Sequence, residues 1–292
     1  MSDISKFAVD GNEYNFKDSE ARSSISAINS ELSQTEKKSG FINITEDFDN
    51  GTFSNNLASY NTGNYIVKTY NNVTYAAVLA HYDYYYNEGK SDYANVNSHH
   101  WIAVVMGFGE GKMNTTNTTS GGFKGSTMNT WLKGDCATAV KGAFGTNHLI
   151  SHSCILTTGT YSPTNIGYDG TNNRIIESNS PTDGFSWSWD AGEYAMIMTE
   201  QQLYGTTCFC YQNWEPGEAT RPLKLFKDKS FMEVLGHNFG QSHNNFNTYN
   251  CWLRNISSYL PGIHFCFASC SGNAGYGGAS NSYGRFPIII LK

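Results

Sequence analysis

The chain has 292 residues, a formal net charge of −6 and only 15% charged residues, whereas 14% are aromatic and 29 are glycines. A chain of this length buries an ample core in one large domain or two smaller ones. Aromatic residues pack well in sheets and glycines suit tight turns, so the composition favours a β-rich, loop-rich fold. The net negative charge disfavours a role in coating nucleic acid or binding a membrane surface.

Targeting signals and cysteine spacing indicate where the chain is made. No stretch approaches the roughly 20 apolar residues of a membrane span, and the N-terminus lacks the pattern of a secretory signal. We therefore expect synthesis in a cytoplasm, from which cell lysis could release the protein. The seven cysteines, among them Cys208, Cys210, Cys266 and Cys270, show no disulfide framework or paired zinc spacing, so we expect reduced thiols.

The N-terminal segment predicts a hairpin and an oligomerisation helix. Residues 6–16 alternate around Asp10-Gly11, a turn dipeptide typical of β-hairpins. In the following helix, apolar residues recur at coiled-coil spacing at Ala21, Ile25, Ile28 and Leu32. Isoleucine at both core positions favours coiled coils of more than two helices, so we expect a short parallel coiled coil in a homotrimer. The alternative is a single helix packed on its own domain. A linker then ends the first domain, residues 1–40.

Residues 41–292 are expected to form the second domain, with a possible β subdomain over residues 41–120 and a core over residues 121–292. Apolar runs between Asn and Gly clusters predict strands at Tyr65–Val67, Tyr75–Leu79 and Trp101–Met106. The polar residues 114–126 predict an exposed loop.

Helical signals follow in two places. Residues 127–145 carry an apolar stripe interrupted at Gly134, and Asp135 is expected to cap the second part. Thr199 with Gln202 matches a capping box and predicts a short helix that ends at Gly205.

The C-terminal part, from residue 250 onward, is expected to alternate short strands with Gly, Asn and Ser turns. It ends in the apolar run Pro287–Leu291, which predicts a buried strand.

Several catalytic and metal-binding motifs are incomplete. The glycine-rich run Gly107–Lys112 departs from a phosphate loop, because Met113 stands where that loop needs Ser or Thr. Sequence alone cannot place two carboxylates at a glycosidase separation. No carboxylate or cysteine lies at helical metal spacing from the histidines His81, His99 and His100. Glu215-Pro216-Gly217 lacks the asparagine of a lectin calcium loop. We expect no metal, no cofactor and no catalysis.

The most informative feature is the composition of residues 242–291. This segment contains no Asp, Glu, Lys, Gln or Met, and its only charged residues are Arg254 and Arg285. It is rich in Tyr, Ser, Asn and Gly. Tyrosine gives a large, stiff contact area with a hydrogen-bonding tip, and the small polar residues give adaptable contacts, as in antibody paratopes. The segment therefore predicts a binding surface; the alternative is an ordinary Asn/Gly-rich β surface.

Alternation within the segment selects the candidate residues. Along residues 262–268, Ile263, Phe265 and Phe267 should enter the core, so His264 and Cys266 should point outward. In the same way, Asn255, Ser257 and Tyr259 should lie on the side opposite Ile256. The candidate ligand-binding residues are Asn245, Asn247, Tyr249, Asn255, Ser257, Tyr259, His264, Cys266, Asn273, Tyr276, Asn281 and Tyr283.

An ordered set of motifs is similar to a family of phage tail receptor-binding proteins with a C-type-lectin-like C-terminal domain. The motifs are Ser126–Leu132, Met198–Gly205, Pro222–Phe226, Cys251–Arg254 and Tyr283–Pro287. Each is weak, but their order and spacing over roughly residues 95–292 make the match fairly specific. The N-terminal residues 9–22 likewise resemble the start of tail-fibre proteins of phages that infect Firmicutes. The chain departs from the family at Phe286, where an arginine usually precedes the proline.

The resemblance implies an α+β, C-type-lectin-like domain with a variable ligand-binding face near its C-terminus. In such families, diversity-generating retroelements mutate adenines, and an asparagine codon mutated at its adenines cannot encode Lys, Glu, Gln, Met or Trp. The segment 242–291 lacks four of these five, and Trp252 is then expected to be a fixed scaffold residue. The implied partners are a host cell-surface protein or glycan, further copies of the chain and other tail proteins bound through the N-terminus. The implied location is the virion, after synthesis in a bacterial cytoplasm.

Two other classes of protein stay open. One is a purely structural tail or head-decoration protein. The other is an enzyme on the related scaffold of formylglycine-generating enzymes, for which Cys266 and Cys270 would matter. A shared fold does not by itself confer an activity.

Overall fold

A computed structural model describes residues 6–9, 12–15, 40–86, 96–157, 187–210, 222–241, 250–257, 259 and 262–292. The chain divides into two compact units, Met1–Ser39 and Gly40–Lys292. Over the described residues, the second unit is an α+β structure, rich in strands, with two main sheets and short helices. None of the helices in these ranges combines the length and the apolarity that a membrane crossing needs.

The N-terminal unit contains an antiparallel pair, β1 (Lys6–Val9) and β2 (Asn12–Asn15). Val9 lies opposite Asn12, so the register confirms the hairpin predicted around Asp10-Gly11. The predicted coiled-coil seam, from Ala21 to Leu32, lies outside the described residues.

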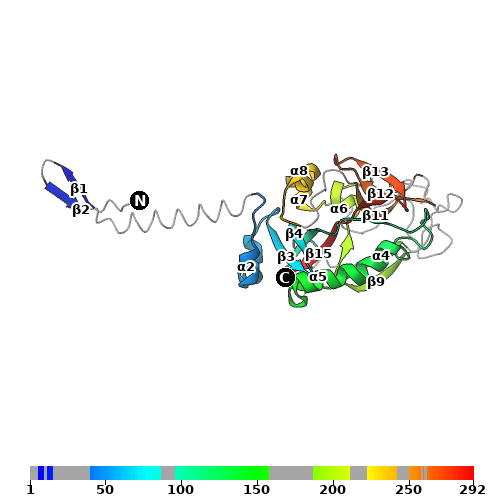
Figure 1. The fold of residues 1–292 in the computed structure, drawn as a ribbon, viewed down its shortest axis with the longest axis horizontal. Coiled ribbons are helices and arrows are strands. Elements are labelled where there is room, and N and C mark those ends of the chain that lie inside the picture. The colour runs from blue at the N-terminus through cyan, green and yellow to red at the C-terminus, as the bar shows by residue number, and fades with distance from the viewer. Residues whose placement is uncertain are drawn as a thin grey trace, which may run out of the picture. The chain divides into compact units, whose positions relative to one another are not determined.

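The first sheet of the second unit has the strand order β10-β15-β5-β4-β3, with β7 also paired to β15. Its strands are β3 (Tyr65–Tyr70), β4 (Val73–Tyr82), β5 (Trp101–Met106), β7 (Leu149–Ile150), β10 (Met196–Ile197) and β15 (Pro287–Leu291). The C-terminal strand β15 thus runs between β5 and β10, inside the sheet (Figure 1). The strands predicted from apolar runs are confirmed.

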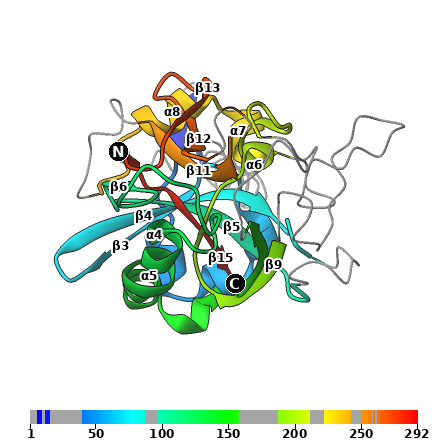
Figure 2. The same ribbon diagram turned by 90° about the vertical axis from the view of Figure 1, so that its right-hand side faces the viewer.

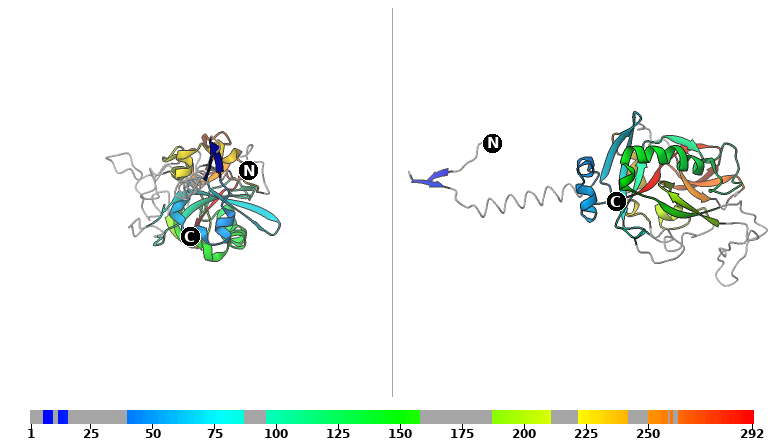
Figure 3. Two further views of the ribbon diagram at one scale, coloured as in Figure 1. Left: turned by 90° about the vertical axis from the view of Figure 1, so that its left-hand side faces the viewer. Right: turned by 90° about the horizontal axis from the view of Figure 1, so that it is seen from below.

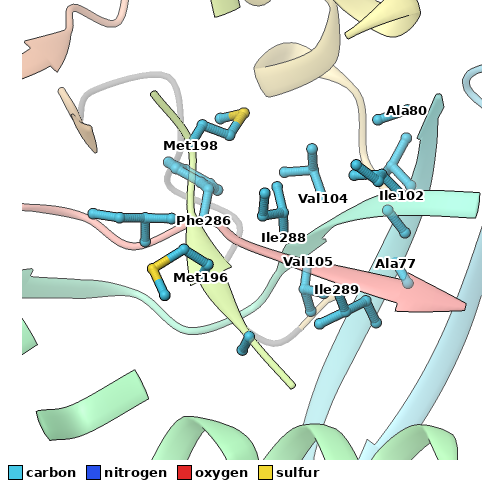
Figure 4. Close-up of a cluster of buried hydrophobic side chains, with 14 of the residues drawn as sticks. Ala77, Ala80, Ile102, Val104, Val105, Met196, Met198, Phe286, Ile288 and Ile289 are labelled. Atoms are coloured by element: carbon cyan, nitrogen blue, oxygen red, sulfur yellow. The ribbon is translucent and has the colours of Figure 1, made fainter. Parts of the chain in front are cut away.

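Both faces of β5 and β15 are buried. Val104 and Val105 are 1% and 0% exposed, and Ile288 and Ile289 are 1% and 0% exposed. In Figure 4, Val104 lies beside Ile288 and Val105 lies beside Ile289. A strand covered on both faces requires apolar residues at successive positions, which explains why these two segments are continuous apolar runs.

Short helices lie on both faces of the first sheet. α4 (Thr127–Trp131), the π-helical turn η2 (Leu132–Cys136) and α5 (Ala137–Phe144) follow one another on one side (Figures 2 and 3). α7 (Lys224–Asp228) and α8 (Phe231–Gly236) lie on the other side. The remaining short helices are α2 (Thr45–Asp49), α3 (Thr52–Asn55), η1 (Leu57–Ser59), η3 (Thr146–His148) and α6 (Glu200–Tyr204).

The second sheet has the order β13-β12-β11-β14-β6. Its strands are β6 (Glu110–Lys112), β11 (Cys251–Ile256), β12 (His264–Ala268), β13 (Ala274–Gly278) and β14 (Ser282–Gly284). A separate antiparallel pair consists of β8 (His152–Thr157) and β9 (Trp187–Glu193). Each main sheet combines strands from before and after residue 120.

Capping and loop predictions had mixed outcomes. The capping box of Thr199 and Gln202 is confirmed at α6, which ends at Gly205 in a left-handed conformation. The prediction that Asp135 caps a second helix is wrong, because the helix continues through the π-helical turn and its first cap is Ser126. The predicted exposed loop over residues 114–126 is irregular but partly buried, since Phe123 and Ser126 are 0% exposed.

Candidate ligand-binding surface

The β12–β13 hairpin carries several of the predicted residues. Cys266 lies opposite Tyr276, and His264 lies opposite Gly278. Residues opposite one another in a sheet share a face, as do residues two apart along one strand. His264, Cys266 and Tyr276 therefore belong to the same face of the hairpin.

Aromatic side chains gather around Tyr276 on this face. Its ring centroid lies 4.9 Å from that of Tyr259, 5.3 Å from that of His264 and 5.1 Å from that of Phe209. Tyr259 is 57% exposed, while the other three side chains are partly buried. We call Phe209, Tyr259, His264 and Tyr276 the aromatic patch.

Tyr283 lies on the opposite face of the hairpin. Its ring centroid is 4.9 Å from that of Phe267 and 4.4 Å from that of the buried Trp252. A Cβ atom on Gly277 would lie only 2.7 Å from the Tyr283 hydroxyl, so this glycine leaves room for the ring. The exposed Asn281 donates a hydrogen bond from Nδ2 to that hydroxyl at 3.0 Å. The predicted residues therefore divide between two faces.

Three predicted surface residues are buried, so the prediction that they point outward is wrong. Asn255 is 1% exposed, and its Oδ1 accepts the backbone N–H of Glu200 at 2.7 Å. Ser257 is 0% exposed, and its Oγ accepts the backbone N–H of Tyr259 at 3.0 Å. Cys266 is 0% exposed. Alternation would leave one face of β11 and β12 open, whereas packing covers both faces at these positions.

The remaining predicted residues lie in a turn away from the aromatic patch or outside the described residues. Asn273 is exposed in the turn between β12 and β13, where its backbone N–H donates to Ser269 Oγ at 3.0 Å and its Nδ2 to Ser271 Oγ at 3.2 Å. It lies outside the aromatic patch. Three further candidates, Asn245, Asn247 and Tyr249, lie outside the described residues.

Phe209 is a patch residue that the sequence did not reveal. It follows α6 in the segment Cys208–Cys210, whose backbone N–H groups all donate to the carboxylate of Glu200. The segment has no strand alternation and lies far from β13 in the chain. Only the folded arrangement brings it to Tyr276.

The strands that carry His264 and Tyr276 contain little charge. From residue 250 onward the only charged residues are Arg254, Arg285 and Lys292. Arg254 is 0% exposed, and the Arg285 guanidinium stacks 4.1 Å from the ring centroid of Trp131. Strands β11–β14 therefore present aromatic and neutral polar groups rather than fixed charge.

The buried thiols are in an unreactive environment. Burial raises the pKa of Cys266 well above its ordinary value, and the nearby Glu200 carboxylate raises it further. Burial also raises the pKa of Cys251. A thiol held in its protonated form is a weak nucleophile and a poor metal ligand.

The histidines considered as metal ligands have structural contacts. His99 Nδ1 lies 2.7 Å from Asp83, and the ring of the buried His100 accepts the backbone N–H of Tyr85 at 3.2 Å. His81 Nδ1 accepts the backbone N–H of Lys224 at 3.0 Å. Within the described ranges, no three His, Cys, Asp or Glu side chains are grouped so that they could hold a metal ion.

Comparisons with known proteins add no assignment: no family model, no curated protein and no solved structure matches this chain.

Proposed function

We propose that this protein is a phage tail receptor-binding protein that recognises a host cell-surface protein or glycan through the aromatic patch. The observation that carries the proposal is the contact of Tyr259, His264 and Phe209 with the ring of Tyr276. Aromatic rings beside small polar residues give stiff contact area together with hydrogen bonds, as binding surfaces require. Because strands β11–β14 carry little charge, we expect the ligand to be selected by shape and hydrogen bonding.

The proposed fold of residues 41–292 is C-type-lectin-like. Two sheets with few short helices agree with this fold at the level of class. Trp252 is 0% exposed, as a fixed scaffold residue would be. Phe286 is 1% exposed, and a Cβ atom on Gly284 would lie 2.7 Å from its ring. The departure from the family pattern at this position therefore places an apolar residue in an apolar site.

We also propose that the C-terminal segment is diversified by a retroelement. Of the candidate variable positions, Tyr259, Asn273 and Asn281 are exposed, and His264, Tyr276 and Tyr283 are partly exposed. A reverse transcriptase gene beside this one, with a template repeat that matches codons 242–286, is the expected observation. A neighbourhood without such a repeat would contradict diversification and leave the binding proposal standing.

The proposed assembly is a homotrimer in the virion, attached to other tail proteins through the N-terminal unit. The motivation is the isoleucine seam of the predicted coiled coil at Ile25 and Ile28. The raised pKa of the buried Cys266 favours this binding role over an enzyme that uses the same thiol.

The proposal is tested by binding of the labelled full-length chain to cell-envelope preparations from a panel of Firmicutes. The double variant Tyr259→Ala/Tyr276→Ala should bind at least about tenfold more weakly, because buried aromatic anchors typically contribute about 2 kcal/mol or more each. The matched control, Asn281→Ala/Tyr283→Phe, changes the opposite face and should bind like the original chain.

Equal binding by the patch variant and the original chain would contradict the proposal. Dissociation of the oligomer in the patch variant would instead favour the purely structural alternative, in which the patch lies in a subunit interface.

A further inference from the structure

Glu200 is a fully buried carboxylate at the start of α6. Its Oε2 accepts the backbone N–H groups of Cys208 at 2.9 Å and Cys210 at 3.0 Å, and its Oε1 accepts that of Phe209 at 3.0 Å. Burying a carboxylate is unfavourable unless hydrogen bonds replace its lost water. Three convergent N–H groups provide that replacement. Hydrogen bonds to a carboxylate are stronger than hydrogen bonds between neutral groups.

These bonds fold the segment from Glu200 to Cys210 back on itself. α6 is fixed to β11, because the Glu200 N–H donates to Asn255 Oδ1 at 2.7 Å. At the other end of α6, Gly205 adopts a left-handed φ of 76° and turns the chain. Phe209 then projects from the middle of the three residues whose N–H groups the carboxylate binds.

The result is a defined contact between two distant parts of the chain. The ring of Phe209 meets Tyr276 nearly edge to face, with an interplanar angle of 68° and a centroid distance of 5.1 Å. Edge-to-face pairs at this separation are favourable. Tyr276 in turn contacts Tyr259 and His264, so the position of Phe209 affects the whole patch.

We infer that Glu200 is a positioning residue of the aromatic patch, whose carboxylate holds Phe209 against Tyr276 and so preorganises the binding surface. A buried apolar side chain of similar size would avoid the desolvation cost, but it could not fix three backbone N–H groups. Preorganisation of this kind improves affinity because less freedom is lost on binding. The consequence for ligand binding rests on the proposed function, whereas the positioning of Phe209 does not.

The positioning is tested in the free full-length protein with Glu200→Gln. This variant keeps the size of the side chain but puts an NH₂ donor where the N–H groups need an acceptor. Hydrogen exchange at the amides of residues 208–210 should become about 10- to 100-fold faster, and the NMR contact between the rings of Phe209 and Tyr276 should be lost. The control is Glu233→Gln, at a glutamate of α8 that accepts the backbone N–H of Ser230 at 2.7 Å.

Unchanged exchange and an intact ring contact in Glu200→Gln would overturn the inference. If Glu200→Gln does not fold, Glu200→Asp keeps the charge but shortens the reach, and the same two measurements on it decide. Faster exchange at residues 208–210 together with a shifted Phe209 ring would support the inference, whereas faster exchange with an unshifted ring would overturn it.

The link to binding is tested by a double-mutant cycle with the same envelope preparations. Phe209→Ala and Glu200→Gln should each weaken binding about 2- to 10-fold. If Glu200 acts through Phe209, the double variant should bind no more weakly than Phe209→Ala alone. Additive losses would overturn this link. If Tyr259→Ala/Tyr276→Ala leaves binding unchanged, the proposed function is wrong, and the exchange and ring-contact measurements alone decide the role of Glu200.

Discussion

At the scale of single residues, the fold depends on Gly107, which follows β5. Its φ of 107° lies in the region that side chains disfavour, and a Cβ atom there would lie 2.6 Å from the carbonyl oxygen of Thr74. The obstacle is backbone, which cannot move aside as the end of a side chain can. Gly134 is the opposite case, because it lies in η2 with nothing within 4 Å of its would-be Cβ atom.

Gly107→Ala is therefore expected to lower the free energy of unfolding by about 1–3 kcal/mol. The matched substitution Gly134→Ala should raise it by about 0.4–1 kcal/mol, since alanine restricts the unfolded chain and meets no obstacle in the folded one. Denaturant unfolding of the two variants measures both effects. Equal effects of the two substitutions would contradict the close approach of β4 to Gly107.

At the scale of elements, the docking of α6 on β11 determines how much of the C-terminal segment is accessible. Asn255 was expected at the surface, but it is buried, and its Oδ1 accepts the backbone N–H of Glu200 in the first turn of α6. Local signals could predict the hairpin, the capping box and the buried strand β15, because a turn dipeptide, a cap or an apolar run acts within a few residues.

Local sequence patterns did not predict burial where a segment distant in the chain covers a strand. Alternation in β12 correctly places Phe265 in the core, but it cannot reveal that α6 and the residues after it bury Cys266 as well. For the same reason no local pattern could predict Phe209 as part of the patch. Of the predicted residues, Tyr259 and His264 lie beside the ring of Tyr276, whereas Tyr283 belongs to the other face.

Asn255→Ala should lower the free energy of unfolding by about 1–2 kcal/mol, because it removes an acceptor from a helix-terminal N–H that is buried. Thermal or denaturant unfolding measures this loss. Asn281→Ala, at an exposed asparagine, serves as the comparison and should change stability by less than about 0.5 kcal/mol. A larger loss at Asn281 than at Asn255 would contradict the placement of these two residues.

At the scale of the whole molecule, we expect the proposed adhesin to be a trimer. The full-length chain should have a mass of about 97 kDa in solution, three times the 32.3 kDa of one chain. Replacing Ile25 and Ile28 with Ser should dissociate it, because both belong to the predicted coiled-coil seam. Light scattering that gives 32.3 kDa for the original chain at micromolar concentration would contradict the trimer.

We propose that the aromatic patch, rather than the opposite face of the hairpin, contacts the host surface. Hydroxyl-radical footprinting of the full-length chain, free and bound to a cell-envelope preparation, distinguishes the two faces. We predict that oxidation of Tyr259 and Tyr276 falls on binding while that of Tyr283 stays unchanged. Protection of Tyr283 with Tyr259 and Tyr276 unaffected would contradict the claim.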